Sequence, residues 1–198
     1  MTKFILLRHG EPTYDEVVKL GFKGTGLALA PLTPKGISDV QETAKNKIFE
    51  NSDILISSPY TKTMQTASII AKRHNLDINV EPLLHEWIPD LSNNYNTEEE
   101  FLELIRTAKC DWELKKRNHN HICSFKTEAL DHVQERAIEA LSKYLDYNKV
   151  IVVSHGLLIS TLFKEKVRLQ TAGFIMVTDS EINENLKQIG MGKTLCKK

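Results

Sequence analysis

The chain has 198 residues, of which 41% are hydrophobic and 26% charged, so it can bury one ordinary core and is expected to form a single domain over residues 1–198. Lys and Arg together number 26, as do Asp and Glu, which excludes a global field that would attract nucleic acid or a membrane. An anionic ligand must therefore be recognised by a local group of side chains.

Cysteine usage and the start of the chain predict a reducing compartment. The cysteines are odd in number and lack a CxxC spacing, which predicts free thiols at Cys110, Cys123 and Cys196. The first apolar run, residues 4–7, is only four residues long. Such a run is too short for a secretory signal or a membrane span, so we expect a cytoplasmic protein.

The first half of the chain alternates predicted strands and helices. Residues 4–7 (FILL) form a continuous apolar run, typical of a strand that is covered on both faces. Thr33 and Pro34 predict the N-cap and first residue of a helix that reaches about residue 49. The next predicted elements are a buried strand, a helix and a short strand, at residues 53–57, 62–74 and 78–80.

The second half begins with a segment of different character. Residues 90–125 open with a polar, turn-rich stretch, and the TEEE sequence from residue 97 predicts a capped helix start. We expect this segment to be an insertion that forms a small helical lid over one end of the sheet. A long amphipathic helix is predicted next, at residues 127–147, followed by the most apolar strand at 150–153 and another helix at 157–163. Two closing strands are predicted at 174–177 and 185–189.

The alternation of strands and helices predicts the fold class. We expect an α/β fold, a three-layer α/β/α sandwich with a mostly parallel sheet and an antiparallel edge. In such folds ligands bind beyond the carboxyl ends of the strands, so the residues at these ends are the first candidates for a site.

Two of the predicted buried strands end in the same way. The first strand runs from FILL into RHG at residues 8–10, and the most apolar strand runs from VIVV into SHG at residues 154–156. Each strand thus ends near a histidine, and the glycine after it, Gly10 or Gly156, lets the backbone approach a ligand closely.

A third strand adds a cation to this set. It ends at Ser57-Ser58-Pro59, and Lys62 follows near the start of a helix. If the three strands are parallel neighbours, they bring together His9, His155, Arg8 and Lys62. Two imidazoles and two cations beside a helix N-terminus can hold an anion, and phosphate is the anion expected.

In these motifs the chain resembles the histidine phosphatase superfamily, also called phosphoglycerate mutase-like. The matching segments are LRHGEP at 7–12, PLTPKG at 31–36, SSPYTKTMQTA at 57–67, LLHEW at 83–87 and VVSHG at 152–156. The first and last are specific in combination and in their order along the chain. The match extends over most of the chain.

The resemblance implies a role for each of these residues. His9 is the nucleophile that becomes phosphohistidine, and Arg8 and His155 hold the phosphoryl oxygens. Lys62 stands where the family usually has a second arginine, and Glu86 stands where the family's proton donor occurs. Each role has a chemical reason: a neutral imidazole is a nucleophile near pH 7, cations stabilise the transferred phosphoryl group, and a basic alkoxide needs a proton to leave.

Three positions depart from the family pattern. Lys62 replaces the bidentate fork of arginine by a point charge, which predicts weaker or differently oriented phosphate binding. Asp15 stands where many members have an asparagine near the phosphate, so it is expected to turn away or to pair. Glu86 lacks the usual glycine-containing run after it, and His85 or Glu11 could share the proton transfer.

The predicted activity is metal-independent hydrolysis of a small phosphorylated metabolite, without a cofactor. The alternatives are a phosphoglycerate-type mutase, a phosphohistidine-protein phosphatase, and a phosphate-ester-binding regulator whose catalysis is impaired at Lys62. A metal hydrolase is a further alternative, with the ligands His9, His155, Asp15 and Glu86. The pair His119 and His121, and the basic run at 115–117, are expected to be solvated, although the run could reach a second anionic group of the substrate.

Overall fold

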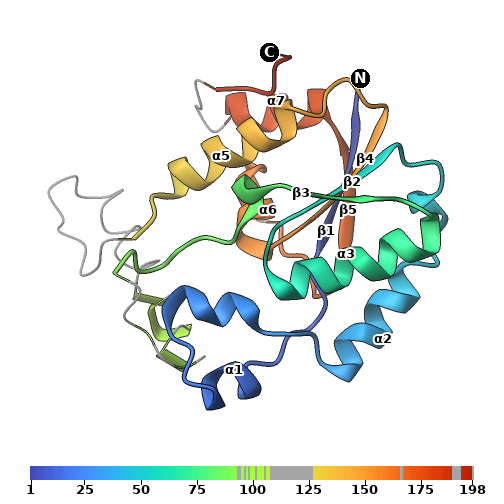
Figure 1. Cartoon of the computed structure of the whole chain (residues 1–198). Helices are drawn as coiled ribbons and strands as arrows, with labels where there is room; N and C mark the ends of the chain where they lie inside the picture. The colour runs from blue at the N-terminus through green and yellow to red at the C-terminus, as the bar shows by residue number, and fades with distance from the viewer. Residues whose placement is uncertain are drawn as a thin grey trace, which may run out of the picture.

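A five-stranded sheet lies at the centre of the computed structural model, which describes residues 1–92, 95, 97, 99–100, 102–104, 106–107, 127–165, 167–188 and 193–197 (Figure 1). The strands are β1 (Lys3–Arg8), β2 (Ile54–Ser57), β3 (Ile78–Val80), β4 (Lys149–Ser154) and β5 (Phe174–Thr178). Their order is β3-β2-β4-β1-β5; the first four are parallel, and β5 runs antiparallel to β1 at the edge. The predicted mostly parallel sheet with an antiparallel edge is confirmed.

Helices cover both faces of this sheet, as the three-layer prediction requires (Figure 1). On one face lie α2 (Pro34–Thr43) and α3 (Thr61–His74), and on the other α5 (Leu130–Ser142), α6 (Gly156–Thr161) and α7 (Asp179–Gln188). Alternate residues of β1 point to opposite faces of the sheet, and each face has its own hydrophobic core. Ile5 and Leu7 pack with α2 and α3, whereas Phe4 and Leu6 pack with α5 and α7. Burial of each such side chain contributes about 1.5–3 kcal/mol, so the continuous apolar runs are what hold the three layers together.

A third, smaller hydrophobic cluster lies apart from the two faces of the sheet. It joins α1 (Asp15–Lys19), the short 3-10 helix η1 (Gly24–Leu29) and Tyr95 through Val17, Leu27 and Ala30. The backbone N–H of Gly24 donates to the carbonyl of Tyr95 at 2.7 Å. The loop after β1 is therefore tied to the segment that follows residue 90.

The start of α2 is as predicted, but its end is not. The hydroxyl of Thr33 accepts from the N–H of Gly36 at 2.8 Å, and Pro34 is the first helical residue. The helix ends at Thr43, and a separate turn, η2 (Lys47–Phe49), follows. The side chain of Asn46 accepts from the N–H of Ile48 and caps this new turn, so the single helix predicted to residue 49 is wrong.

The strand predicted at residues 185–189 is also wrong, because residues up to Gln188 belong to α7. Thr178 and Glu181 form a reciprocal capping box: the Glu181 N–H donates to Oγ1 of Thr178 at 3.2 Å, and the Thr178 N–H donates to the Glu181 carboxylate at 2.7 Å. Ile182 and Leu186, four residues apart, are both fully buried against the core. This spacing is helical. The long helix expected over 127–147 is shorter and spans only α5.

Part of the predicted lid segment is described. Residues 99, 100, 102–104, 106 and 107 are helical, and the N–H of Glu100 donates to the Thr97 hydroxyl at 3.1 Å, as the capped start predicts. The basic run at 115–117, the histidines 119 and 121, and the cysteines 110 and 123 lie outside the described residues. Cys196 is a free, exposed thiol. A lid over the site stays a prediction.

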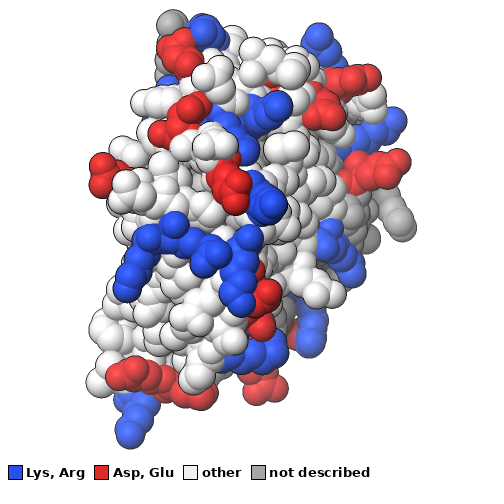
Figure 2. All heavy atoms as spheres, turned by 90° about the vertical axis from the view of Figure 1, so that its right-hand side faces the viewer, with Lys and Arg blue, Asp and Glu red and all other residues white. Residues whose placement is uncertain are grey.

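The surface carries charges of both signs. On the face turned toward the viewer in Figure 2, Lys and Arg side chains are accompanied by Asp and Glu. On α2, Lys35 and Asp39 form an ion pair with their charged atoms 2.9 Å apart. In the described part of the chain no helix is long and apolar enough to cross a bilayer.

Two further short elements lead toward the site. They are β3 and the 3-10 helix η3 (Pro82–Leu84), after which the chain passes the carboxyl end of the sheet. The carboxylate of Glu81 caps η3 by accepting from the N–H of Leu83 at 3.1 Å. Lys143, the C-cap residue of α5, donates to the same carboxylate at 2.9 Å, so the start of this segment is fixed.

Candidate active site

The two strand-end histidines meet at the carboxyl edge of the sheet. β1 and β4 are neighbours in a register that pairs Arg8 with Ser154, so His9 and His155 leave the sheet side by side. Their ring centroids are 5.2 Å apart at an interplanar angle of 63°. The convergence of the two imidazoles that the sequence predicted is therefore present in the structure.

A hydrogen bond decides which nitrogen of the His9 ring carries the proton. Nδ1 lies 2.7 Å from the carbonyl of Gly10, so it carries the ring proton and donates it, which leaves the lone pair on Nε2. Burial, with the positive charges of Lys62 and Arg8, lowers the pKa of His9 to about 3. His9 is therefore a neutral imidazole at physiological pH, with one nitrogen available as a nucleophile.

Glycine at position 10 is required by close packing. A Cβ there would lie 2.8 Å from the carbonyl oxygen of Gly36 and 2.8 Å from Cγ2 of Val40. The N–H of Gly10 donates to Thr66 at 3.0 Å, and the same hydroxyl donates to the carbonyl of Lys62. Thr66 thus links the His9 turn to α3. The N–H of Gly10 is thus engaged within the protein, and its contact with phosphate stays a prediction.

The two predicted cations reach the histidines from different elements. Lys62, in the first turn of α3, donates to the Tyr14 hydroxyl at 2.9 Å and lies 5.3 Å from the centroid of that ring. Arg8 donates from Nη1 to the carbonyl of Leu169 at 2.8 Å, and its buried Nε has no hydrogen-bond partner among the described residues. A Cβ at Gly156 would lie 3.2 Å from this Nε, so Gly156 makes room for the guanidinium.

His155 is held in a fully buried position. Its Nε2 lies 2.8 Å from the hydroxyl of Ser58, and the Tyr60 ring approaches edge-on at a centroid distance of 5.0 Å. Burial, His9 and Lys62 lower the pKa of His155 well below its ordinary value, so this ring is also neutral. When Ser58 donates to Nε2, Nδ1 carries the proton and is a free donor, because it has no other partner in the described structure.

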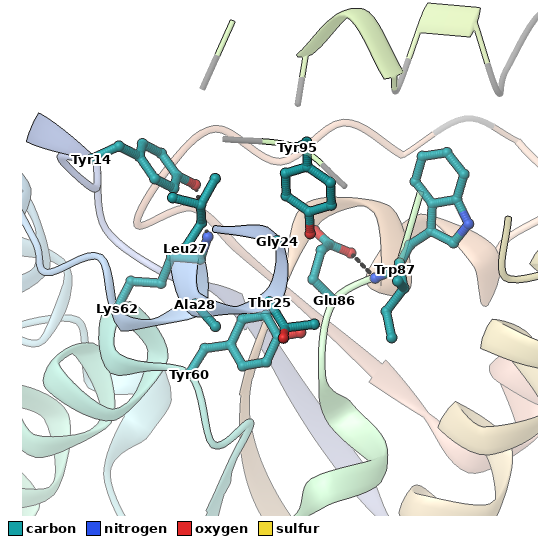
Figure 3. A pocket seen from close by; sticks show the side chains of 11 residues that line it. Tyr14, Gly24, Thr25, Leu27, Ala28, Tyr60, Lys62, Glu86, Trp87 and Tyr95 are labelled. Carbon is teal, nitrogen blue, oxygen red and sulfur yellow. Dashed lines mark hydrogen bonds between the residues drawn. The ribbon is translucent and has the colours of Figure 1, made fainter. Parts of the chain in front are cut away.

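Glu86 enters the site from the segment after η3. Its Oε1 accepts from the N–H of Trp87 at 3.0 Å and, more weakly, from the N–H of Leu158 in α6 at 3.4 Å. Loss of hydration raises the pKa of this carboxyl, although these two donors and the cations Lys62 and Arg8 oppose the shift. Figure 3 shows the carboxyl and the hydroxyl end of Tyr95 pointing toward one another. Glu86 is thus suited to hold a proton at a higher pH than an exposed glutamate.

A buried ion pair holds the segment that carries Glu86. The guanidinium of Arg136 in α5 makes two hydrogen bonds to the Glu128 carboxylate, of 2.8 and 3.1 Å, and two more to the carbonyls of Leu83 and His85, of 2.7 and 2.6 Å. Glu128 in turn accepts from the N–H of Ile88 at 3.1 Å. The pair therefore fixes the backbone on both sides of Glu86.

A small cavity, with about 30 Å³ of space for water-sized molecules, adjoins these groups (Figure 3). Its walls come from the loop after β1, the start of α3, the segment after η3, and Tyr95. The lining residues are Tyr14, Gly24, Thr25, Leu27, Ala28, Tyr60, Lys62, Glu86, Trp87, Ile88 and Tyr95. Lys62 and Glu86 therefore face the same cavity.

The remaining sequence candidates have other partners. Asp15 is exposed and accepts from the Thr13 hydroxyl at 3.2 Å, so it turns away as expected. The Glu11 carboxylate accepts from the Thr33 hydroxyl at 2.9 Å, and His85 donates from Nδ1 to the carbonyl of Glu86 at 2.8 Å. Within the residues described, His, Cys, Asp and Glu side chains nowhere form a group of three that could hold a metal ion. The four-ligand metal site considered from the sequence is thus not assembled.

Sequence reasoning missed the aromatic lining of the cavity. Tyr14 and Tyr60 both lie beside Lys62 in space, and Trp87 and Tyr95 flank Glu86. Tyr60 could have been noticed from its place between the strand-end serines and Lys62. Trp87 could have been noticed likewise, because it follows Glu86 directly in the LLHEW motif. Tyr14 and Tyr95 carried no such signal, because each joins the site from a separate loop.

Comparisons with known proteins agree with this geometry. A family model described as "Histidine phosphatase superfamily (branch 1)" matches residues 4–179. The probable phosphoglycerate mutase GpmB of Cronobacter sakazakii is 25% identical over 166 residues, which cover 82% of this chain and 73% of that protein. The GpmB of Proteus mirabilis is 31% identical over 86 residues, 43% of this chain and 38% of that protein.

Two solved structures illustrate the similarity in fold. A mycobacterial glucosyl-3-phosphoglycerate phosphatase in complex with VO3 has 18% identity and a TM-score of 0.67, over 90% of this chain and 91% of that one. The phosphoserine phosphatase of Entamoeba histolytica in complex with 3-phosphoglyceric acid has 24% identity and a TM-score of 0.64, over 91% and 92% of the two chains.

Proposed function

The chain belongs to the histidine phosphatase superfamily, and from this premise we propose that it hydrolyses phosphate monoesters of small metabolites through a phosphohistidine at His9. The observation that carries the proposal is the state of His9: a neutral ring whose Nδ1 proton is bound to Gly10, beside two cations and a second imidazole. Such a nitrogen can attack phosphorus without first losing a proton.

In the first step Nε2 of His9 attacks phosphorus, and the bond from phosphorus to the ester oxygen breaks. The electron pair of that bond leaves with the oxygen, and the proton of Glu86 moves to it, so the alcohol departs neutral. The raised pKa of Glu86 supports this role, because it keeps the acid protonated to a higher pH. Arg8, Lys62 and His155 would stabilise the charge that spreads over the equatorial oxygens.

In the second step a water molecule hydrolyses the phosphohistidine. The Glu86 carboxylate takes a proton from water as the water oxygen attacks phosphorus, and the bond from phosphorus to Nε2 breaks. His9 recovers its lone pair, Glu86 is again protonated, and inorganic phosphate leaves. The cycle consumes one water molecule and needs no redox partner.

Cationic side chains would supply the charge neutralisation that a metal ion supplies in other phosphatases. We therefore expect activity to be indifferent to a chelator. Inhibition by a chelator that added metal reverses would contradict this part of the proposal.

A phosphomutase is the second candidate, because relatives of this chain carry the name of phosphoglycerate mutase. A mutase would form the same phosphohistidine but would return the phosphoryl group to a second hydroxyl of the substrate. The two activities differ in product: the phosphatase releases inorganic phosphate, whereas the mutase interconverts phosphoglycerate isomers without releasing it.

The test is a screen of metabolite phosphates with acid-quench detection of labelled enzyme. Labelled wild type should carry an acid-labile, base-stable phosphoryl group and should release phosphate, and His9→Ala should do neither. His74→Ala is a matched control, because this histidine binds the carbonyl of Ala44 away from the site. Ligand binding without label or turnover in the wild type would instead indicate a regulatory protein.

A further inference from the structure

The ammonium of Lys62 is held by a tyrosine that has no part in the two proposed steps. Its Nζ donates to the Tyr14 hydroxyl at 2.9 Å and lies 5.3 Å from the centroid of the same ring (Figure 3). The centroid of the Tyr60 ring is 6.0 Å from Nζ. Lys62 is only 7% exposed, so protein groups rather than water surround most of this side chain.

A lysine at this position needs such a partner more than an arginine does. The ammonium sits on a flexible four-carbon stem, whereas a guanidinium is a planar, preorganised fork. A phosphate that binds to the ammonium must therefore restrict several single bonds of the stem. A fixed contact at Nζ restricts them beforehand, which reduces the conformational freedom that is lost when phosphate binds.

Tyr14 is itself fixed by the segment in which it lies. It is the N-cap residue of α1, and its carbonyl accepts from the N–H of Val18 at 3.0 Å. Its partly buried side chain packs against the third hydrophobic cluster, which contains Val17 and Leu27. The hydroxyl is therefore presented to Lys62 by a ring that is anchored in its own core.

The ammonium is held where its charge acts on the catalytic groups. Burial, followed by the charge of Lys62, lowers the pKa of His9 to about 3. The same charge opposes the rise that burial causes in the pKa of Glu86. An ammonium group has three donors, so Nζ can keep its bond to Tyr14 while the other two donors bind phosphoryl oxygens.

We propose that Tyr14 is a positioning residue for Lys62, and that its hydroxyl orients the ammonium toward the phosphoryl group. The inference rests on the proposed binding of phosphate by Lys62, and it adds the residue that orients this cation. It gives a physical reason why a lysine can stand where the family usually has an arginine: the tyrosine supplies the rigidity that the lysine stem lacks.

The experiment is a double-mutant cycle that measures the binding of inorganic phosphate by calorimetry. Tyr14→Phe keeps the ring and its packing but removes the hydroxyl, and it should weaken phosphate binding by about tenfold, since the lost hydrogen bond has a charged donor. In a Lys62→Met background the same change should alter the affinity by less than about twofold, because no ammonium remains to be oriented. Tyr147→Phe is the matched control: it removes the hydroxyl of an exposed tyrosine at the amino end of β4 and should leave the affinity unchanged.

Rescue by arginine separates orientation of the lysine from a general structural role. In a Lys62→Arg background Tyr14→Phe should weaken phosphate binding by less than about threefold, because the guanidinium fork is already rigid. A tenfold loss there as well would show that the hydroxyl supports the site without regard to the lysine, and the inference would be wrong.

The other outcomes are equally decisive. An equal loss in the wild-type and Lys62→Met backgrounds would overturn the inference, as would a wild type that binds no phosphate. Tighter binding by Tyr14→Phe would show that the tyrosine holds the ammonium away from phosphate, which is the opposite of the inference. The label on His9 tests the proposed function separately: if His9 takes none and no ester is hydrolysed, that function fails, while the phosphate-binding cycle still decides the role of Tyr14.

Discussion

The buried pair of Arg136 and Glu128 offers a sharp test of how Glu86 is positioned. Arg136→Met removes the charge but keeps a side chain of similar length. The carboxylate of Glu128 then stays buried without its two guanidinium bonds, and the carbonyls of Leu83 and His85 lose their donors. Removing one partner of a buried pair costs about 3–5 kcal/mol, so we expect a loss of this size in the free energy of unfolding.

The coupling between the two residues can be measured by a double-mutant cycle. Glu128→Gln alone leaves the guanidinium unpaired and should also destabilise the protein. The double variant removes both charges, so its loss should be smaller than the sum of the two single losses by about 2 kcal/mol. The assay is urea unfolding at pH 7. Single losses below about 1 kcal/mol, or additive losses, would refute the reasoning.

The same variants should change activity through Glu86. At a temperature where Arg136→Met is fully folded, we expect kcat on an alkyl phosphate to fall by about tenfold or more, because the alkoxide needs the proton of a well-placed acid. kcat on 4-nitrophenyl phosphate should change little, since its leaving group departs without a proton. Equal slowing of both esters would show that the pair does not act by positioning Glu86.

Burial has three further measurable consequences. The raised pKa of Glu86 predicts that kcat/KM for an alkyl ester falls as the pH rises through a midpoint above 4.5. In Glu86→Gln this fall with pH should disappear, and kcat/KM should be lower by about a hundredfold or more. The pKa of His9, about 3 in the folded state and 6.5 ordinarily, means that the unfolded chain binds more protons between these values. The free energy of unfolding should therefore fall by up to about 5 kcal/mol as the pH drops from 6.5 to 3. Urea unfolding across this pH range measures the fall in the wild type and in His9→Gln. In His9→Gln the fall should be smaller by the contribution of His9, up to about 5 kcal/mol. Gly36→Ala would place a Cβ 2.3 Å from the backbone oxygen of Glu11, and it should lower the free energy of unfolding by about 3 kcal/mol; an unchanged urea midpoint would contradict the packing argument.

Local pattern was enough to predict the layers and the residues at the strand ends. Continuous apolar runs mark strands that are covered on both faces, and the residues after such runs must emerge at the edge of the sheet. This is why His9, His155 and Lys62 could be named before the fold was known. The strand predicted at residues 185–189 was wrong because a short apolar pattern suits either a strand or a helix. The capping box of Thr178 and Glu181 is the sequence signal that favours the helix.

What the sequence alone determined is therefore the set of chemical groups and the end of the sheet at which they emerge. Only the tertiary structure decided that β1 and β4 are neighbours, which proton His9 carries, and that Arg136 of a distant helix holds the backbone around Glu86. It also decided that rings from four separate segments line one cavity. The physical reason is that burial, tautomer and pKa depend on contacts between segments far apart in the chain, and no local pattern records which segments will meet.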